Sequence, residues 1–396
     1  MGTIFSEKAV AGVSGGSEIR AMFERGARMA ADFGPENVYD FTLGNPDPEA
    51  DPKVTASIHK YAEQPGIHKY MANAGYRDVR DTVAAYETGD KGVDFTGDRI
   101  LMVAGAAAGL NVVFKSILNP GENVLTVAPY FVEYRSYVSN HGGTLRPVPA
   151  EDGTFQPDVE ALLAAVDENT KAVLLNSPNN PTGVVFAEER LRALADGLSE
   201  AEERIGHPVF VISDEPYAKI IYDGVRVPSV PAIFPHSIIV TSFSKSLALP
   251  GERIGYIAVG PEVPEAETLM QCMILCARTL GFVNAPSLFQ RVIADNLDLA
   301  TGVESYRERR DRLLEIINKA GFCCVKPEGA FYLFPKSPVE DDRAFCEAAL
   351  KHHILAVSGS GFGYPGYFRL AYCVSMETIE NSEKAWMELG KEFRLI

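Results

Sequence analysis

The chain has few positive charges, few cysteines and no long apolar run, and each shortage excludes a class of protein. Its 396 residues include 37 lysines and arginines against 53 acidic residues, a formal charge of −16 at pH 7. This negative balance argues against nucleic acid or an anionic membrane as the main partner. It leaves room for an anionic substrate, because a few arginines suffice to make a local positive pocket.

No stretch approaches the roughly 20 apolar residues of a membrane span. The N-terminus lacks a basic region followed by an apolar core, so we expect no signal peptide. The six cysteines are scattered and none forms a CxxC pair, which argues against a disulfide framework or a zinc site. These shortages together predict a cytoplasmic protein without a metal site.

What the chain does contain is an alternation of apolar runs and helical segments. Helices are expected from about Ser17 to the stop at Gly34-Pro35, and over 188–204 and 306–318. Six apolar runs are predicted strands: 100–103, 123–127, 172–176, 209–213, 238–241 and 254–259. Continuous apolar runs separated by helices predict an α/β fold with a mostly parallel sheet covered on both faces. The length suffices for two domains, which we place at 46–288 and at 1–45 together with 289–396.

The segment Ser242-Phe243-Ser244-Lys245-Ser246 follows the predicted strand 238–241. A lysine just past the C-terminal end of a strand is where α/β folds place reacting groups. The hydroxyls of Ser242 and Ser244, with Arg253 further on, are suited to bind a phosphate beside the amine. An amine beside a phosphate suggests pyridoxal phosphate, whose aldehyde forms a Schiff base with lysine. The alternative for a single such lysine is a surface residue in a polar turn.

Two other strand ends offer partners for the ring of that cofactor. Asp214 follows the strand 209–213 and is suited to pair with a protonated pyridine nitrogen, which makes the ring a stronger electron sink. Alone, it would be interpreted as a helix N-cap. Tyr217 is placed to reach the cofactor's phenolic oxygen. Asn180 lies in the run Asn-Ser-Pro-Asn-Asn-Pro-Thr-Gly at 176–183, which is a turn on local chemistry, and its amide is suited to donate to the same oxygen.

The first predicted strand is followed by small residues that include Gly105, Ala106 and Ala107. Small residues let a phosphate approach backbone N–H groups at a helix start, where the helix dipole favours an anion. The alternative is a turn that is small only for close packing. After the next strand, Phe131 offers a ring to stack on a flat cofactor, or is an aromatic residue of the core.

Together these residues resemble the fold-type I pyridoxal-phosphate enzymes, specifically the class I/II aminotransferases related to aspartate aminotransferase. The matching motifs run from Gly44 to Arg369 in the family's order. Ser-x-Ser-Lys with Gly-Glu-Arg-Ile-Gly, and Asn-Asn-Pro-Thr-Gly, are the most specific. The resemblance implies a mostly parallel, seven-stranded type of sheet sandwiched by helices, a smaller α+β domain from the N- and C-terminal parts, and a homodimer whose two subunits both contribute to each site.

The resemblance also implies the role of each residue. Lys245, Asp214 and Tyr217 are the catalytic set, with Lys245 as the Schiff-base lysine. The implied cofactor ligands are Asp214 on the ring nitrogen, Asn180 and Tyr217 on the ring oxygen, Phe131 on the ring face, Gly105, Ala106, Ala107, Ser242, Ser244 and Arg253 at the phosphate, and Tyr70 at the phosphate of the neighbouring subunit. The implied substrate ligands are Arg369 and Gly44 on the α-carboxylate, and Asn180.

Two positions depart from the family pattern. Family members often carry a hydroxyl or amide side chain where Ala107 stands, so one phosphate ligand is missing here. Phe131 replaces a tyrosine or tryptophan, which keeps the stacking and removes a polar group. Neither position touches the reaction centre.

The expected reaction is a ping-pong transamination from an L-amino acid to a 2-oxo acid such as 2-oxoglutarate, with Lys245 as general base. Aspartate and glutamate are favoured as donors by the resemblance alone; aromatic amino acids, methionine and alanine stay open. The alternatives are a C–S β-lyase, a decarboxylase or a racemase on the same fold, and a non-catalytic, cofactor-binding regulator. Arg369 disfavours a decarboxylase, because it would anchor the carboxylate that leaves. A nicotinamide dehydrogenase is a more distant alternative.

Overall fold

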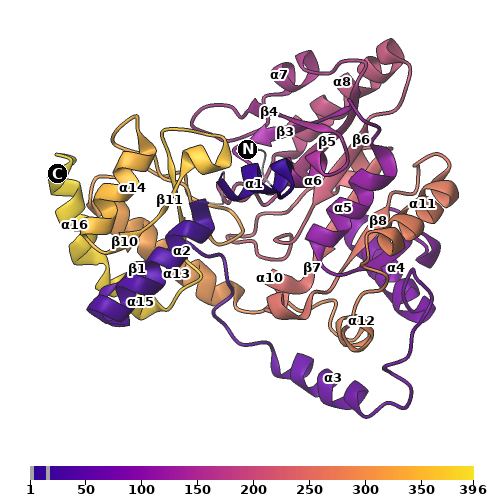
Figure 1. Cartoon of the computed structure of the whole chain (residues 1–396), viewed down its shortest axis with the longest axis horizontal. Coiled ribbons are helices and arrows are strands. Elements are labelled where there is room, and N and C mark those ends of the chain that lie inside the picture. The colour runs from indigo at the N-terminus through magenta and orange to yellow at the C-terminus, as the bar shows by residue number, and fades with distance from the viewer. Residues whose placement is uncertain (1–3, 15–17) are drawn as a thin grey trace. The chain divides into compact units, whose positions relative to one another are not determined.

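The chain folds into two units in the computed structural model, which describes residues 4–14 and 18–396 (Figure 1). The large unit consists of Asn45–Ser305 and Pro327–Ala330. The small unit consists of Met1–Gly44, Tyr306–Lys326 and Phe331–Ile396. Residues 289–305, which the sequence placed with the smaller domain, lie in the large unit, where α12 (Ser287–Ala294) packs against α3 (Pro52–Ala62) and α4 (Arg77–Lys91).

A seven-stranded sheet lies at the centre of the large unit, in the order β2-β8-β7-β6-β5-β3-β4. Its strands are β2 (Ile100–Val103), β3 (Asn123–Ala128), β4 (Thr144–Pro149), β5 (Thr170–Asn176), β6 (Phe210–Asp214), β7 (Ser237–Ser242) and β8 (Gly255–Val259). Neighbours from β7 to β4 are parallel, and β8 is antiparallel to both β7 and β2. The mostly parallel sheet is therefore confirmed, and the C-terminal ends of its parallel strands share one edge.

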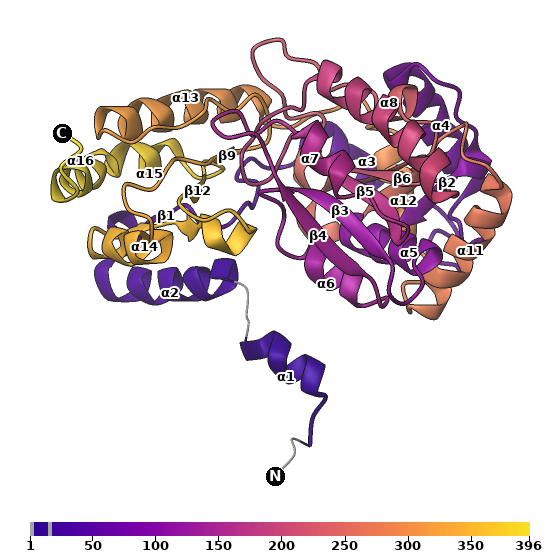
Figure 2. The same ribbon diagram turned by 90° about the horizontal axis from the view of Figure 1, so that it is seen from above.

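Helices cover both faces of this sheet, and its strands are largely buried, apart from the edge strand β4. Figure 2 shows α5, α6 and α11 on one face and α7 and α8 on the other. The remaining bounds of this unit are α5 (Ala106–Ile117), α6 (Tyr134–Ser139), α7 (Val159–Ala164), α8 (Glu188–Ile205), α9 (Val230–Ile233), α10 (Phe243–Ser246), α11 (Ala266–Thr279), η2 (Gly97–Arg99) and η3 (Pro250–Glu252).

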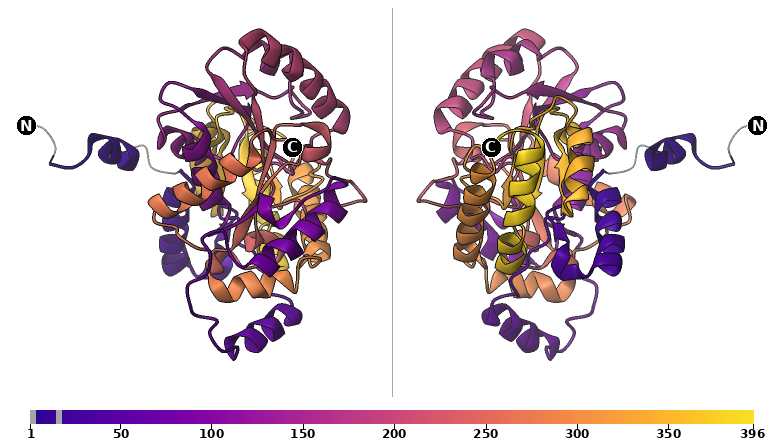
Figure 3. Two further views of the ribbon diagram at one scale, coloured as in Figure 1. Left: turned by 90° about the vertical axis from the view of Figure 1, so that its right-hand side faces the viewer. Right: turned by 90° about the vertical axis from the view of Figure 1, so that its left-hand side faces the viewer.

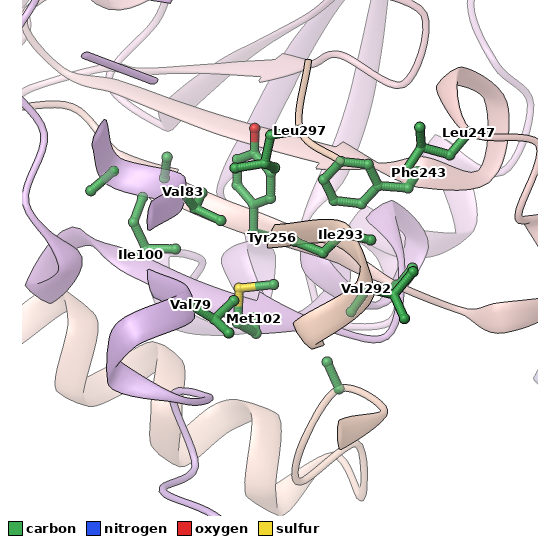
Figure 4. Close-up of a cluster of buried hydrophobic side chains, with 14 of the residues drawn as sticks. Val79, Val83, Ile100, Met102, Phe243, Leu247, Tyr256, Val292, Ile293 and Leu297 are labelled. Atoms are coloured by element: carbon green, nitrogen blue, oxygen red, sulfur yellow. The ribbon is translucent and has the colours of Figure 1, made fainter. Parts of the chain in front are cut away.

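One hydrophobic cluster supports the segment that carries Lys245. Phe243 and Leu247, from α10 and its end, pack with Tyr256 of β8 and with Val292 and Ile293 of α12 (Figure 4). The rings of Phe243 and Tyr256 have centroids 5.9 Å apart. Side chains on both sides of Lys245 are therefore fixed in the core.

The small unit combines short strands with helices. Its elements are α1 (Glu7–Ser14), α2 (Glu18–Phe33), η1 (Pro35–Asn37), β1 (Tyr39–Asp40), α13 (Val303–Lys319, which begins in the large unit), β9 (Tyr332–Leu333), α14 (Asp342–Lys351), β10 (Ile354–Leu355), β11 (Val357–Ser358), η4 (Gly359–Phe362), β12 (Phe368–Ala371), α15 (Met376–Asn381) and α16 (Glu383–Glu392). Strands β11, β12 and β9 form an antiparallel sheet, and β1 pairs with β10. In the right view of Figure 3, the yellow α16 lies between α13 and α14.

This α+β unit from the two ends of the chain agrees with the prediction. The expected first helical residue, Ser17, lies outside the described residues, and α2 is described from Glu18. Within 4–14 and 18–396, no helix is both long and apolar enough to cross a membrane.

Candidate active site

The sheet brings the polar strand ends of the large unit side by side. Asp214 ends β6, and in the sheet register it is paired with Asn176, which ends the neighbouring β5. On its other side lies β7, which ends at Ser242. The chain then turns directly into the short helix α10, where Lys245 is half-buried. The predicted acid and lysine thus leave the same edge of the sheet from adjacent strands.

Asp214 is a buried carboxyl group with one satisfied oxygen. It is 5% exposed, and its Oδ2 accepts a hydrogen bond of 2.5 Å from the hydroxyl of Tyr134. Its Oδ1 is buried and has no hydrogen-bond partner among the described residues. Burial raises the pKa of Asp214 to about 7; the Tyr134 hydrogen bond opposes this rise, and the charge of Glu215 adds to it. A cationic N–H aimed at Oδ1 would satisfy that oxygen and favour the ionised form.

The turn after β5 is held together by asparagine side chains that sequence reasoning did not single out. Asn176 donates from Nδ2 to the backbone oxygen of Asp214 at 2.9 Å and accepts the backbone N–H of Asn180 at 2.8 Å. Asn179 accepts from the hydroxyl of Thr182 at 2.9 Å. Asn176 therefore joins two strand ends of the site. Its place as the last residue of an apolar strand was the signal that could have identified it.

The start of α5 lies against Arg253. Gly105 is the N-cap, with φ 82° and ψ 168°, a backbone conformation that is essentially limited to glycine. A Cβ at Gly105 would lie 2.9 Å from Nη2 of Arg253. Arg253 is exposed, and its Nη1 donates to the carbonyl of Pro250 at 2.9 Å. The N-terminal N–H groups of Ala106 and Ala107 and this guanidinium form a cradle whose charge suits an anion.

The remaining predicted cofactor ligands of the large unit lie near these elements. Ser242 and Ser244 are both buried, on either side of the turn from β7 into α10. Tyr217 is buried in the segment that follows β6. Phe131 is half-buried, and its ring meets that of Tyr134 edge to face, with centroids 5.5 Å apart. One aromatic pair thus joins the predicted stacking ring to the hydrogen-bond partner of Asp214.

Arg369 and Gly44 lie together in the small unit. The guanidinium of Arg369 lies between the rings of Tyr332 and Phe362, 4.6 and 4.8 Å from their centroids, and its Nη2 donates to the carbonyl of Thr42. Arg369 is only 2% exposed. A Cβ at Gly44 would lie 2.0 Å from the hydroxyl of Tyr332, so this position needs glycine. A planar guanidinium packed against two rings is a cation suited to bind a carboxylate in bidentate fashion.

Tyr70 differs from the other predicted ligands in being almost fully exposed to solvent. It lies between α3 and α4 in the large unit and is 94% exposed. An almost fully exposed tyrosine is available to a second molecule, whereas it contributes little to the packing of its own chain.

Comparison with known proteins places these features in context. A family model described as aminotransferase class I and II matches residues 36–384. A probable aspartate/prephenate aminotransferase of Thermus aquaticus is 34% identical over 350 residues, which cover 86% of this chain and 88% of that protein. The crystal structure of an aminotransferase from Eubacterium rectale matches with a TM-score of 0.96 and 39% identity, covering 99% of this chain and 100% of that one. Aspartate aminotransferase from Thermus thermophilus with maleate matches with a TM-score of 0.83 and 27% identity, covering 94% and 97% of the two chains.

Proposed function

Because this chain belongs to the class I and II aminotransferase family and resembles aspartate aminotransferases, we propose that it transfers an amino group from an L-amino acid to a 2-oxo acid with pyridoxal 5′-phosphate as its cofactor. The observation that carries the cofactor assignment is the buried Oδ1 of Asp214, which has no partner among the described residues. A protonated pyridine nitrogen is a donor of the charge and shape that this oxygen requires.

The residues around Asp214 fit the rest of that cofactor. Bound to the enzyme, the cofactor supplies an aldehyde for the amine and a ring that withdraws electrons. Its phosphate would be held at the start of α5 by Gly105, Ala106, Ala107, Arg253, Ser242 and Ser244. Its ring oxygen would be held by Asn180 and Tyr217, and Phe131 would stack on its ring.

In the proposed reaction, the chain's own side chains orient the substrate and move one proton. The guanidinium of Arg369 binds the α-carboxylate, and the N–H of Gly44 adds a hydrogen bond to the same group. The amine of Lys245 would take the proton from the substrate Cα as general base and, as an ammonium, would return a proton as general acid. Asp214 stays ionised and holds the proton on its ring partner. The same steps in reverse with a 2-oxo acid complete a ping-pong cycle.

Acidic amino acids are the favoured donors. The relatives include several aspartate aminotransferases, and the Thermus thermophilus enzyme was crystallised with maleate, a dicarboxylate. A panel of donors that includes aspartate, glutamate, phenylalanine, methionine and alanine, each with 2-oxoglutarate or pyruvate, tests this. A kcat/KM for aspartate below that for the apolar donors would reject the acidic preference.

We predict that Lys245→Ala removes both turnover and the visible absorbance of the lysine-bound cofactor, because no other amine is assigned to that position. The measurement is the absorbance spectrum of the purified variant together with an aminotransferase assay. Lys171→Ala, at a half-buried lysine of β5, is the control and should stay yellow and active. A yellow and active Lys245→Ala would contradict the assignment.

A C–S β-lyase is the alternative on the same fold, and product stoichiometry separates the two. An aminotransferase forms one new amino acid for each donor consumed. A C–S β-lyase releases a thiol, ammonia and pyruvate from an S-substituted cysteine without any 2-oxo acid acceptor. A non-catalytic regulator would bind the cofactor and give neither product.

A further inference from the structure

The residue after Asp214, Glu215, belongs to a buried ion pair. The ammonium of Lys91, at the end of α4, is 2.7 Å from Oε2 of Glu215, and the two side chains are 7% and 4% exposed. Glu215 follows Asp214 in the chain, yet the two carboxyl groups take partners from different helices: Tyr134 of α6 for Asp214 and Lys91 of α4 for Glu215. A second carboxylate with its own counter-charge therefore adjoins the acid assigned to the cofactor ring.

Both the side chain and the backbone of Glu215 are held by hydrogen bonds. Its Oε1 accepts from the hydroxyl of Ser213 at 2.7 Å. Its backbone N–H donates to the carbonyl of Val240 at 2.8 Å, and its carbonyl accepts from the hydroxyl of Thr241 at 3.0 Å. Val240 and Thr241 belong to β7, which leads into the lysine segment. The same residue thus ties the end of β6 to the strand that carries Lys245.

The residues around the Lys91–Glu215 pair extend to the segment 242–246, which contains Lys245. Glu87 of α4 is buried and accepts a hydrogen bond from the hydroxyl of Tyr256. A cavity of about 250 Å³ is lined by this cluster and by Ser242, Phe243 and Ser246. Burial would lower the pKa of Lys91, but Glu215, Glu87 and Asp90 raise it, so that its side chain stays an ammonium.

Stability alone does not account for the two buried charges. Replacing a buried ion pair by apolar groups of similar volume is often neutral or stabilising. The negative charge of Glu215 also acts on Asp214, whose pKa it raises. A charge that makes Asp214 bind its proton more firmly would equally stabilise a proton on a ring nitrogen bonded to Asp214.

We propose that Lys91 and Glu215 are positioning residues of the cofactor site: Lys91 holds the carboxyl group of Glu215 next to Asp214 in the chain, and the charge of Glu215 helps to hold the proton that Asp214 shares with its ring partner. This inference rests on the proposed function. The titratable and charged groups around the two carboxylates include Tyr134 and Tyr137 of α6, Tyr217, Lys219 and Arg226 beyond β6, Tyr86, Glu87, Asp90 and Lys91 of α4, and Tyr256 of β8.

The test is the pH dependence of the cofactor's association constant with the apoenzyme, measured by equilibrium titration. Binding through an ionised Asp214 weakens as the pH falls through the pKa of that carboxyl group. In Glu215→Gln the midpoint should move to lower pH by about one unit, the lower end of the effect of a close charge. Lys91→Met should move the midpoint in the same direction, because burial disfavours the charged form of a carboxyl group that has lost its counter-charge.

The double variant Lys91→Met/Glu215→Gln should shift the midpoint no further than Glu215→Gln alone, because both changes remove the same charge. It also leaves no buried ion unpaired, so it serves as the readout if a single variant does not fold. Lys91→Arg should keep the wild-type midpoint. Lys384→Met, at a lysine of α16 with an 88% exposed side chain, is the control for a lost surface charge.

Two failures are distinguishable. An unchanged midpoint in both Glu215→Gln and the double variant overturns this inference while leaving the proposed function intact. A wild-type apoenzyme that does not bind pyridoxal 5′-phosphate at any pH overturns the proposed function itself.

Discussion

The protonation of Asp214 makes the stability of the apoenzyme depend on pH. Its pKa is raised from 3.8 to about 7 by burial, with a further rise from Glu215. Between these two values the folded chain keeps a proton that the unfolded chain releases. Its contribution to stability is therefore fully present below about pH 4 and is lost as the pH rises through about 7.

We predict that Asp214→Asn removes this pH-dependent loss of stability, because asparagine does not titrate. The unfolding free energy of the variant, relative to wild type, should increase between pH 4 and pH 8 by on the order of 4 kcal/mol. Urea unfolding of the two apoenzymes at a series of pH values measures it. Tyr134→Phe is the matched variant: it removes the hydrogen bond that lowers the pKa of Asp214, so its loss of stability should extend to higher pH. A wild-type-to-variant difference that stays constant with pH would show that Asp214 does not titrate in this range.

At the residue scale, motif spacing predicted the residues whose chemistry requires one side-chain type, such as Lys245 and Asp214. It did not predict Asn176 or Tyr134, whose roles depend on contacts between elements. Tyr134 becomes the partner of Asp214 only because α6 lies against the sheet near the end of β6, and a lone tyrosine in a six-residue helix carries no signal of that contact.

At the scale of elements, one glycine at the start of a helix and one inside a helix of the large unit differ in what alanine would do there. Gly105 is the N-cap of α5 with φ 82°, and Arg253 lies close to where a Cβ would stand. Gly89 lies in α4 with open space around it and no such φ. Alanine is therefore strained at the first position and favoured at the second.

We predict that Gly105→Ala costs about 1–3 kcal/mol of stability and weakens cofactor binding, because the new methyl group displaces the guanidinium of Arg253 from the cradle. Gly89→Ala should stabilise the chain by about 0.5–1 kcal/mol and leave cofactor binding unchanged. Thermal unfolding and equilibrium dialysis of the cofactor measure the two effects. Equal cofactor affinity in both variants would remove Arg253 and Gly105 from the proposed phosphate site.

The six predicted strands all occur, with bounds that differ by at most two residues, because buried parallel strands are continuous apolar runs. Strand β4 was not predicted. It lies at the edge of the sheet, contains Pro147 and Pro149, and is buried at only some positions. Proline is tolerated in edge strands, so the residues that look unlike a strand are those that this position allows. The antiparallel direction of β8 depends on the short return through η3, which apolar patterning does not encode.

At the scale of the whole molecule, the position of Tyr70 bears on whether one active site uses residues of two chains. The proposed ligands Lys245, Asp214 and Arg253 all belong to one large unit. Tyr70, which the family resemblance assigns to the phosphate of a neighbouring subunit, is 94% exposed. We propose a homodimer in which each site uses Tyr70 of the other chain, and light scattering of the active enzyme at the mass of one chain, 43.1 kDa, would contradict it.

We predict that two defective variants restore each other when they share a dimer. Lys245→Ala lacks the reacting amine, and Tyr70→Ala lacks the phosphate contact that its partner needs. In a hybrid dimer, the Tyr70→Ala chain keeps its own Lys245 and receives Tyr70 from the Lys245→Ala chain, so that one site is complete and the other lacks both groups. Differently tagged variants, unfolded together, refolded and purified through both tags, should regain about half of the wild-type activity per dimer. Each variant refolded alone gives the baseline. A hybrid no more active than the Tyr70→Ala dimer would show that Tyr70 serves its own chain or neither.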